Sequence, residues 1–169
     1  MRAGRTAPRW AYWMKRTGLA AALLALWLPA VGADSIVVDL TAGTVAGVDM
    51  NQSGPALKKK LGARVKKTTE QLEGEPSELW IVFFGKAEVR KHWNGFSFTD
   101  PVFRTKEGLG VGSTVADFDK TYGQSTFSEE EGCHWIFEGK SFIFALESGC
   151  TNDRQQKVNE VWIAARSGQ

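Results

Sequence analysis

Two cysteines, Cys133 and Cys150, carry the most specific side-chain chemistry in this 169-residue chain. In a chain that is exported from the cytoplasm, an even number of cysteines predicts a disulfide rather than a metal ligand or a reactive thiol. A hairpin turn at Gly139 and Lys140 would place Cys133 opposite about residue 146, so that Cys150 lies just beyond the same end of the hairpin. Closing a loop of about 17 residues would stabilise the folded chain by roughly 3 kcal/mol.

The other residue types that could do chemistry do not form a recognisable site. His92 and His134 are two histidines, whereas zinc needs three or four converging ligands. Ser113, His134 and Asp117 could be combined into a triad, but no nucleophile-elbow sequence surrounds the serine, and a helix start explains residues 113 and 117 better. The acidic run Glu129–Glu131 is typical of a solvated loop rather than of facing carboxylates. The sequence therefore predicts no catalytic residue, no metal and no cofactor, and it favours a protein that is not an enzyme.

Two groups of residues are candidates for binding a partner. Lys58, Lys59 and Lys60 belong to a run of six cations within ten residues, which could contact an acidic partner. A solvated helix face, balanced by the acidic residues that follow it, explains the same run. Trp93 and Trp162 form the second group, because tryptophan is enriched at recognition hot spots and two small helices would leave part of a sheet uncovered. Trp93 adjoins an Asn-Gly turn, so we expect it to be exposed.

The first 33 residues have the pattern of a cleaved secretory signal peptide. A basic pair at 15–16 precedes an apolar run over residues 19–31, and residues 31–33 are the small residues that a signal peptidase requires. The run is shorter than the roughly 20 residues of a membrane-spanning helix, so we expect no integral membrane span in the mature chain. Both Met1 and Met14 are compatible starts, because the basic pair follows Met14 directly. The pattern predicts a periplasmic or secreted protein.

Removal of this segment would change the sign of the net charge. The whole chain has 21 basic and 19 acidic side chains. Five of the 21 basic residues precede residue 34, so the mature chain keeps 16 against 19 and carries about −3. A mildly acidic chain has no general electrostatic reason to bind nucleic acid. The roughly 136 residues that remain are enough for one domain or for two small units that share a core.

The mature chain contains one short sequence twice. Residues 80–86 (WIVFFGK) recur, one position shorter, as residues 135–140 (WIFEGK), and each copy follows a short helical pattern that ends in glycine. The repeat predicts an α+β fold of two tandem units, 34–101 and 102–169, each a short helix packed on a three-stranded antiparallel meander. The tryptophan that begins each copy would be a core residue. The alternative is one mixed α+β domain in which the two patterns agree by chance.

The ends of the two helices are marked by capping residues. Ser53 is the expected N-cap of the first helix, and Gly62 is expected to end it. In the second helix Thr114 is the expected N-cap, Asp117 completes a capping box, and Gly123 ends the helix. Helices of two turns are unstable alone, so both must be held by packing against a sheet.

The expected strands follow each helix. Alternating and β-branched patterns predict strands at 79–84, 87–93 and 96–98 in the first unit and at 133–138, 141–147 and 158–164 in the second. One further strand is expected at 36–40, before the first helix. The stretch 63–77, which is first basic and then acidic, is expected to have little regular structure.

The segment 103–114 (FRTKEGLGVGST), with its helix closed by Tyr122 and Gly123 and followed by a meander, resembles a known unit. It is similar to the unit of the BamE-like and β-lactamase-inhibitor-protein-like superfamily of exported bacterial proteins, and to uncharacterised envelope proteins with that arrangement. The resemblance implies protein binding: one branch supports outer-membrane β-barrel assembly, and another blocks β-lactamases with the concave sheet of two tandem units. This chain lacks the lipid-attachment cysteine of the first branch and has a cysteine pair only in its second unit. No inhibitory residue can therefore be transferred.

Together these observations predict an exported, non-enzymatic protein of the bacterial cell envelope that binds another protein, as an inhibitor or immunity factor. Two alternatives stay open. An envelope-assembly or structural component would contact cell-wall or outer-membrane material through Lys58, Lys59 and Lys60. A small envelope hydrolase would need a polar residue with strongly perturbed ionisation in a deep cleft.

Overall fold

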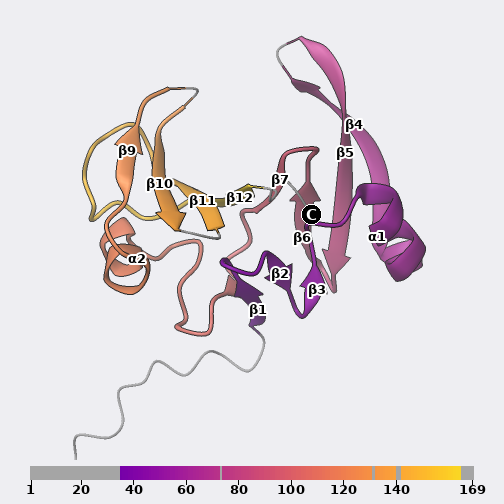
Figure 1. Ribbon diagram of the computed structural model, residues 1–169, viewed down its shortest axis with the longest axis horizontal. Helices are drawn as coiled ribbons and strands as arrows, with labels where there is room; N and C mark the ends of the chain where they lie inside the picture. The colour runs from indigo at the N-terminus through magenta and orange to yellow at the C-terminus, as the bar shows by residue number, and fades with distance from the viewer. Residues whose placement is uncertain (1–34, 73, 131, 140–141, 165–169) are drawn as a thin grey trace, which may run out of the picture. The chain divides into compact units, whose positions relative to one another are not determined.

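The computed structural model describes residues 35–72, 74–130, 132–139 and 142–164, which belong to one compact unit. These residues are mostly β-structure and form two sheets (Figure 1). Their helices are short: α1 (Gly54–Leu61), α2 (Val115–Tyr122) and one turn of 3-10 helix at Gly62–Arg64. The predicted signal peptide, residues 1–33, lies outside the described residues.

The larger sheet has eight strands and is antiparallel throughout. In spatial order the strands are β4 (Val65–Leu72), β5 (Glu75–Phe84), β6 (Ala87–Lys91), β7 (Gly95–Phe98), β12 (Glu160–Ala164), β11 (Phe142–Glu147), β10 (His134–Gly139) and β9 (Thr126–Ser128). The central pair is β7 with β12, in which Phe98 lies opposite Val161 and Phe96 opposite Ile163. Strands from both halves of the chain therefore form one continuous sheet.

The smaller sheet has four short strands. Their order is β3 (Val48–Asp49), β2 (Thr44–Val45), β1 (Ile36–Asp39) and β8 (Phe103–Arg104), and β1 runs parallel to β8. The ring of Phe103 lies 5.0 Å from that of Phe98 and 6.1 Å from that of Phe84, both in the larger sheet. The two sheets thus share one aromatic core.

The four helix ends agree with the sequence. Ser53 Oγ accepts a hydrogen bond from the amide of Ala56 at the start of α1, and Thr114 and Asp117 form a complete capping box at the start of α2. Gly62 and Gly123 end the two helices with φ of 61° and 93°, in the region that favours glycine. These local predictions are confirmed.

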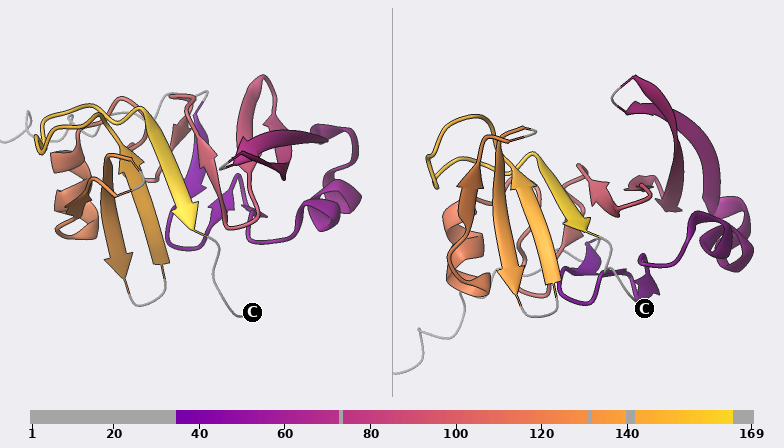
Figure 2. Two further views of the ribbon diagram at one scale, coloured as in Figure 1. Left: turned by 90° about the horizontal axis from the view of Figure 1, so that it is seen from above. Right: turned by 45° about the horizontal axis from the view of Figure 1, so that its top comes forward.

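Both helices pack against the same face of the larger sheet. The ring of Phe118 in α2 lies 6.3 Å from that of Phe137 in β10 and 6.4 Å from that of Phe144 in β11. Figure 2 shows α2 beside the strands of this part of the sheet. The pairing register puts Phe137 and Phe144 on the same face as Trp80 of β5, against which α1 begins. A Cβ on Gly54 would lie 2.2 Å from the Trp80 ring, so this contact requires glycine. We call this side the covered face.

The predicted α+β fold of two helix-plus-meander units is wrong. The described residues are mostly β-structure, with sheets of four and eight strands and two short helices. The stretch 63–77, predicted to have little regular structure, contains β4 and the start of β5, and β9 was not predicted. The strands predicted at 36–40 and in the two meanders are present with shifted ends, but the pairing of β7 with β12 joins them into one sheet. The division at residue 101 stays a prediction.

Candidate functional site

One face of the larger sheet carries neither helix. Because side chains alternate along a strand, the neighbours of the buried aromatic residues point to this other face. Ile136, Ala145 and Trp162 lie side by side there, across β10, β11 and β12. The row continues through Ser97 of β7 to Arg90 of β6. We call the surface around this row the open face; its residues are half-buried or exposed, apart from Ser97.

Trp162 is held in place at the middle of the open face by a histidine. The ring of His92 lies 4.5 Å from the Trp162 ring, and His92 Nδ1 lies 2.6 Å from Glu70 Oε1. Since a carboxylate only accepts, Nδ1 is the donor in this bond. The side chain of His92 is 11% exposed, and its Nε2 has no hydrogen-bond partner among the described residues. Glu70, His92 and Trp162 thus link β4, the end of β6 and β12.

A hollow of about 630 Å³ lies on the open face over the strands β9 to β12. Trp162, Ile136 and Ala145 line its apolar part. Glu147 and Glu160, which also line it, lie directly opposite each other across β11 and β12. Like charges at such positions destabilise a sheet, and neither glutamate forms an ion pair within the part of the chain that the structure describes. The hollow therefore combines an aromatic surface with uncompensated negative charge.

The predicted binding residues are divided between separate surfaces. Trp162 lines the open-face hollow. Trp93 is 72% exposed, as predicted, but it lines a different hollow of about 320 Å³ at the start of α1. Lys58, Lys59 and Lys60 are exposed on α1, which packs against the covered face. The five predicted residues therefore do not form one continuous contact surface.

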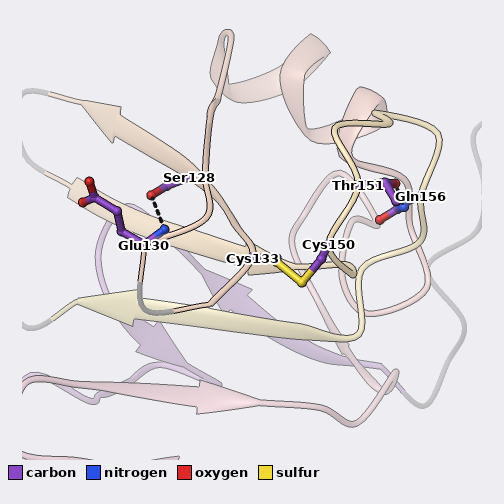
Figure 3. The surroundings of a disulfide bond; sticks show 6 residues. All are labelled: Ser128, Glu130, Cys133, Cys150, Thr151 and Gln156. Atoms are coloured by element: carbon purple, nitrogen blue, oxygen red, sulfur yellow. Dashed lines mark hydrogen bonds between the residues drawn. A yellow bond between two sulfur atoms is a disulfide. The ribbon is translucent and has the colours of Figure 1, made fainter.

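The disulfide between Cys133 and Cys150 is present, which confirms the predicted pairing. The bond joins the residue just before β10 to the loop after β11, with the two Cα atoms 4.9 Å apart (Figure 3). The register differs from the expected one: Leu146 lies opposite Trp135 rather than Cys133. The reason is that Gly139 still belongs to β10, so the turn comes later than predicted.

The disulfide also indicates the kind of cellular compartment in which the chain folds. Intramolecular disulfides persist in oxidising environments and are rare in the reducing cytoplasm. The folded chain therefore belongs to a non-cytoplasmic, oxidising compartment. None of the helices in the described part of the chain is both long and apolar enough to cross a membrane.

Ser113 and Asp117, two of the three residues considered for a triad, have local structural partners, whereas Nδ1 of His134 is buried without a hydrogen-bond partner in the described part of the chain. Ser113 Oγ accepts hydrogen bonds from Arg104 Nη1 at 3.3 Å and from the amide of Gly110 at 3.2 Å. Asp117 belongs to the capping box, where hydrogen bonds from Thr114 hold the pKa of its carboxyl below the usual value. Within the described ranges, no three histidine, cysteine or acidic side chains lie close enough together to hold a metal ion.

One tyrosine has a strongly shifted ionisation. Burial, with a contribution from the charge of Glu107, raises the pKa of Tyr122 to about 12. Its hydroxyl lies 3.4 Å from Glu107 Oε2, so it stays protonated and donates at neutral pH. It lines a hollow of about 200 Å³ with Asp39 and Lys106. A protonated phenol of this kind does not supply the base that the hydrolase alternative needs.

The pair Glu147 and Glu160 and the pair Glu70 and His92 were not predicted as site residues. Alternation along the strands predicts which face Glu147 and Glu160 share, but their direct opposition depends on the register between β11 and β12. The contact of His92 with Glu70 depends on β4, a strand that was not predicted.

Comparisons with known proteins give only distant likeness to solved structures. No protein family matches the chain, and no curated protein matches it. Among solved structures, the chain is similar to the uncharacterised protein YfeY from Escherichia coli, with a TM-score of 0.42 and 10% sequence identity. The match covers 78% of this chain and 97% of that one. A likeness at this level carries no argument about function.

Proposed function

We propose that this chain is an exported, non-enzymatic binding protein of the bacterial cell envelope, periplasmic or secreted, whose open face binds another protein as an inhibitor or immunity factor. One observation carries the proposal: Trp162 lies half-buried beside a hollow, in the middle of a sheet surface that neither helix covers. Large aromatic residues at the centre of such surfaces supply much of the binding energy in protein complexes.

The charges of the hollow favour a partner segment that carries lysine or arginine. A cation placed between Glu147 and Glu160 would remove their mutual repulsion, since the two lie directly opposite each other. The ring of Trp162 can accept the same cation on its face. Charges at the edge of an interface chiefly speed association and select the partner, so we expect binding to weaken as salt increases.

The sequence resemblance supports the same class of function. Residues 103–114 are similar to a unit of the BamE-like and β-lactamase-inhibitor-protein-like superfamily, whose members bind proteins. The similarity identifies no partner and transfers no contact residue.

The proposal is tested by capture from an envelope extract with the purified protein as bait. We expect one protein to be captured by the wild-type chain and by Trp93→Ala, and to be lost with Trp162→Ala. The two variants form a matched pair, because each removes one tryptophan and only Trp162 lines the open-face hollow. Thermal unfolding of each bait checks that it is folded. Equal capture by all three baits would refute the open face as the binding surface.

A second candidate function is supported by a different observation. Lys58, Lys59 and Lys60 are exposed together on α1, as the envelope-assembly alternative requires. Changing all three lysines to glutamate would abolish association with cell-wall or outer-membrane material if they are the contact. Envelope association that survives this change would count against that alternative and leaves the open-face proposal unaffected.

A further inference from the structure

Lys91 is a buried cation in an otherwise apolar part of the covered face. It lies in β6 directly between Phe96 of β7 and Trp80 of β5, and it is 4% exposed. Its Nζ donates to the carbonyl oxygen of Gly95 at 3.3 Å, which is a long hydrogen bond. No carboxylate oxygen of the described residues lies within 4.0 Å of it. An ammonium group has three donors, and buried charges are normally paired. The charge of Lys91 is therefore incompletely compensated.

The acidic residues near Lys91 already have other partners. Asp49 stabilises the charged form of Lys91 only through space, and its Oδ1 accepts hydrogen bonds from the amide and side chain of Asn51. Glu78 forms an ion pair with Lys67. Glu70 accepts from the ring of His92. The unmatched charge in this region is thus positive.

Lys91 lines the hollow of about 320 Å³ at the start of α1. Ser53 and Gly54 contribute the N-terminal end of the helix, whose amide groups and dipole favour a negative charge. Trp80 and Trp93 supply aromatic walls, and Trp93 is exposed to solvent. Glu78 also lines the hollow, and its negative charge is paired with Lys67. This combination of a buried ammonium, a helix start and two indole rings differs from the acidic hollow on the open face, with which it shares no lining residue.

The polar atoms around the hollow are also incompletely bonded. Asn51 Oδ1 and His92 Nε2 belong to residues that line it, and both atoms are buried without a hydrogen-bond partner in the described part of the chain. Buried polar groups in folded proteins are nearly always paired, so unpaired ones are expected where a ligand completes the site. Together with Lys91 they point to a ligand that carries a negative charge and polar hydrogens.

We propose that this hollow binds a carboxylate group, with Lys91 as its counter-ion and Trp93 covering the carbon chain to which the carboxylate is attached. A single cation matches the single charge of a carboxylate better than the multiple charge of a phosphate. The aromatic walls favour a carbon chain next to the charge. The site goes beyond the proposed protein-binding role, and neither depends on the other.

The test uses N-acetylphenylalanine as the probe and its uncharged amide as the matched ligand. Binding is followed through the indole NMR signals of the purified protein, assigned by tryptophan substitution. We expect the acid to shift the Trp80 and Trp93 signals saturably and to leave that of Trp135, which lies in β10 and does not line the hollow, unchanged. The amide should bind at least about tenfold more weakly, because it lacks the charge-assisted bond. Equal binding of acid and amide, or no saturable shift with the acid, would overturn the proposal.

Variants assign the effect to Lys91. Lys91→Met keeps an apolar chain of similar length and should weaken binding of the acid by at least about tenfold. Lys86→Met removes an exposed lysine elsewhere and should change nothing. If Lys91→Met does not fold, Trp93→Ala provides the second test, since its exposed ring can be removed without disturbing the core. Unchanged affinity in a folded Lys91→Met, or in Trp93→Ala, would contradict the assignment.

The source of the carboxylate is distinguished by two further probes. An N-acetylated peptide with a free C-terminus tests a terminal carboxylate, and the same peptide amide with an internal aspartate tests a side-chain carboxylate. Tighter binding of one of them than of N-acetylphenylalanine identifies the source. Failure of both peptides to bind at all, while the small acid binds, would assign the site to a small carboxylic acid.

Discussion

Two rows of side chains on neighbouring positions of the same strands show how differently the two faces of the larger sheet are used. On the covered face, Phe144 and Ile163 lie opposite each other and are at most 3% exposed. One residue further along each strand, Ala145 and Trp162 lie opposite each other on the open face and are half-buried. Alternation alone separates the two rows. One set of strands thus carries both a core that stabilises the fold and a surface that is available for contact.

The charges of the two faces also differ. The open face brings Glu147 and Glu160 together without a counter-ion among the described residues, an arrangement that costs stability. The covered face holds Lys91 between two aromatic residues. Neither arrangement of charge stabilises the folded chain. On each face, therefore, a partner or ligand of opposite charge would be stabilised. The open face would favour a cation and the covered face an anion.

The sharpest test of this comparison is to remove an aromatic ring that packs against the covered face. Phe118→Ala deletes a fully buried ring that packs on Phe137 and Phe144, and should lower the free energy of unfolding by about 3–5 kcal/mol. Ile143→Ala, on the open face and 48% exposed, should cost less than about 1 kcal/mol. Urea unfolding measures both. Similar costs would mean that the open face is part of the core after all.

The local parts of the fold could be predicted from the sequence. Ser53, Thr114 and Asp117 cap helices through bonds to residues three positions away, so their pattern is visible in a short window. The pairing of Cys133 with Cys150 followed from the cysteine count and a nearby hairpin. These features do not depend on where distant segments lie.

The sheet could not be predicted because its pairing is long-range. β7 and β12 are separated by more than sixty residues, yet they form the central pair that joins the strands into one sheet. The sequence of β4 is polar and does not show a strand pattern, because β4 is an edge strand whose lysines and threonines face solvent. Without β4 and the central pair, the repeated motif at residues 80–86 and 135–140 was interpreted as two separate units.

The candidate sites show the same limit. Trp162 was predicted as a binding residue from its type and its position on a strand. Lys91 was not, although Ala87 and Val89 precede it at intervals of two and share its face. That alternation indicated a lysine pointing inward, and together with the predicted exposure of Trp93 it was the signal in the sequence for the hollow at α1.

Reduction of the disulfide tests whether the strands that line the open-face hollow are stabilised by this covalent link as well as by packing on the covered face. The Cys133–Cys150 loop spans 17 residues, so its opening should lower the free energy of unfolding by about 3 kcal/mol. Urea unfolding with and without a reducing agent measures the effect. Cys133→Ala/Cys150→Ala is the control, since the reducing agent should not change it. An unchanged wild-type chain under reduction would contradict the expectation.

A smaller effect of opposite sign is expected on the open face. Glu160→Gln removes one of two opposed charges and should raise the free energy of unfolding by about 0.2–1 kcal/mol. Glu138→Gln is the matched control, because Glu138 lies opposite Ile143 and not opposite an acid. Glu160→Gln should also bind a basic partner more weakly and with less dependence on salt. A loss of stability with Glu160→Gln would mean that an additional cation already compensates the pair.

The smallest expected effect is a difference in the alkaline part of the stability curve, and it concerns the charge on the covered face. Burial lowers the pKa of Lys91 below its usual value, although the charge of Asp49 opposes the shift. Between that lowered pKa and the ordinary value near 10.5, the unfolded chain holds the proton of Lys91 more firmly than the folded chain does. Stability contributed by this group must therefore rise as pH increases through that range. Because Tyr122, whose pKa is raised to about 12, acts in the opposite direction above pH 10, the measurement needs Lys91→Met as its reference.

The free energy of unfolding of the wild-type chain minus that of Lys91→Met, followed by urea unfolding from pH 7 towards pH 10, should rise with pH because the wild-type chain gains stability. N-acetylphenylalanine at saturation should reduce this pH dependence, because a bound carboxylate favours the charged form of Lys91 and restores the proton to the folded state. A difference that does not vary with pH would mean that Lys91 is already fully compensated in the folded chain. The covered face would then contain no unmatched charge, and the hollow at α1 would lose the reason given for a carboxylate ligand.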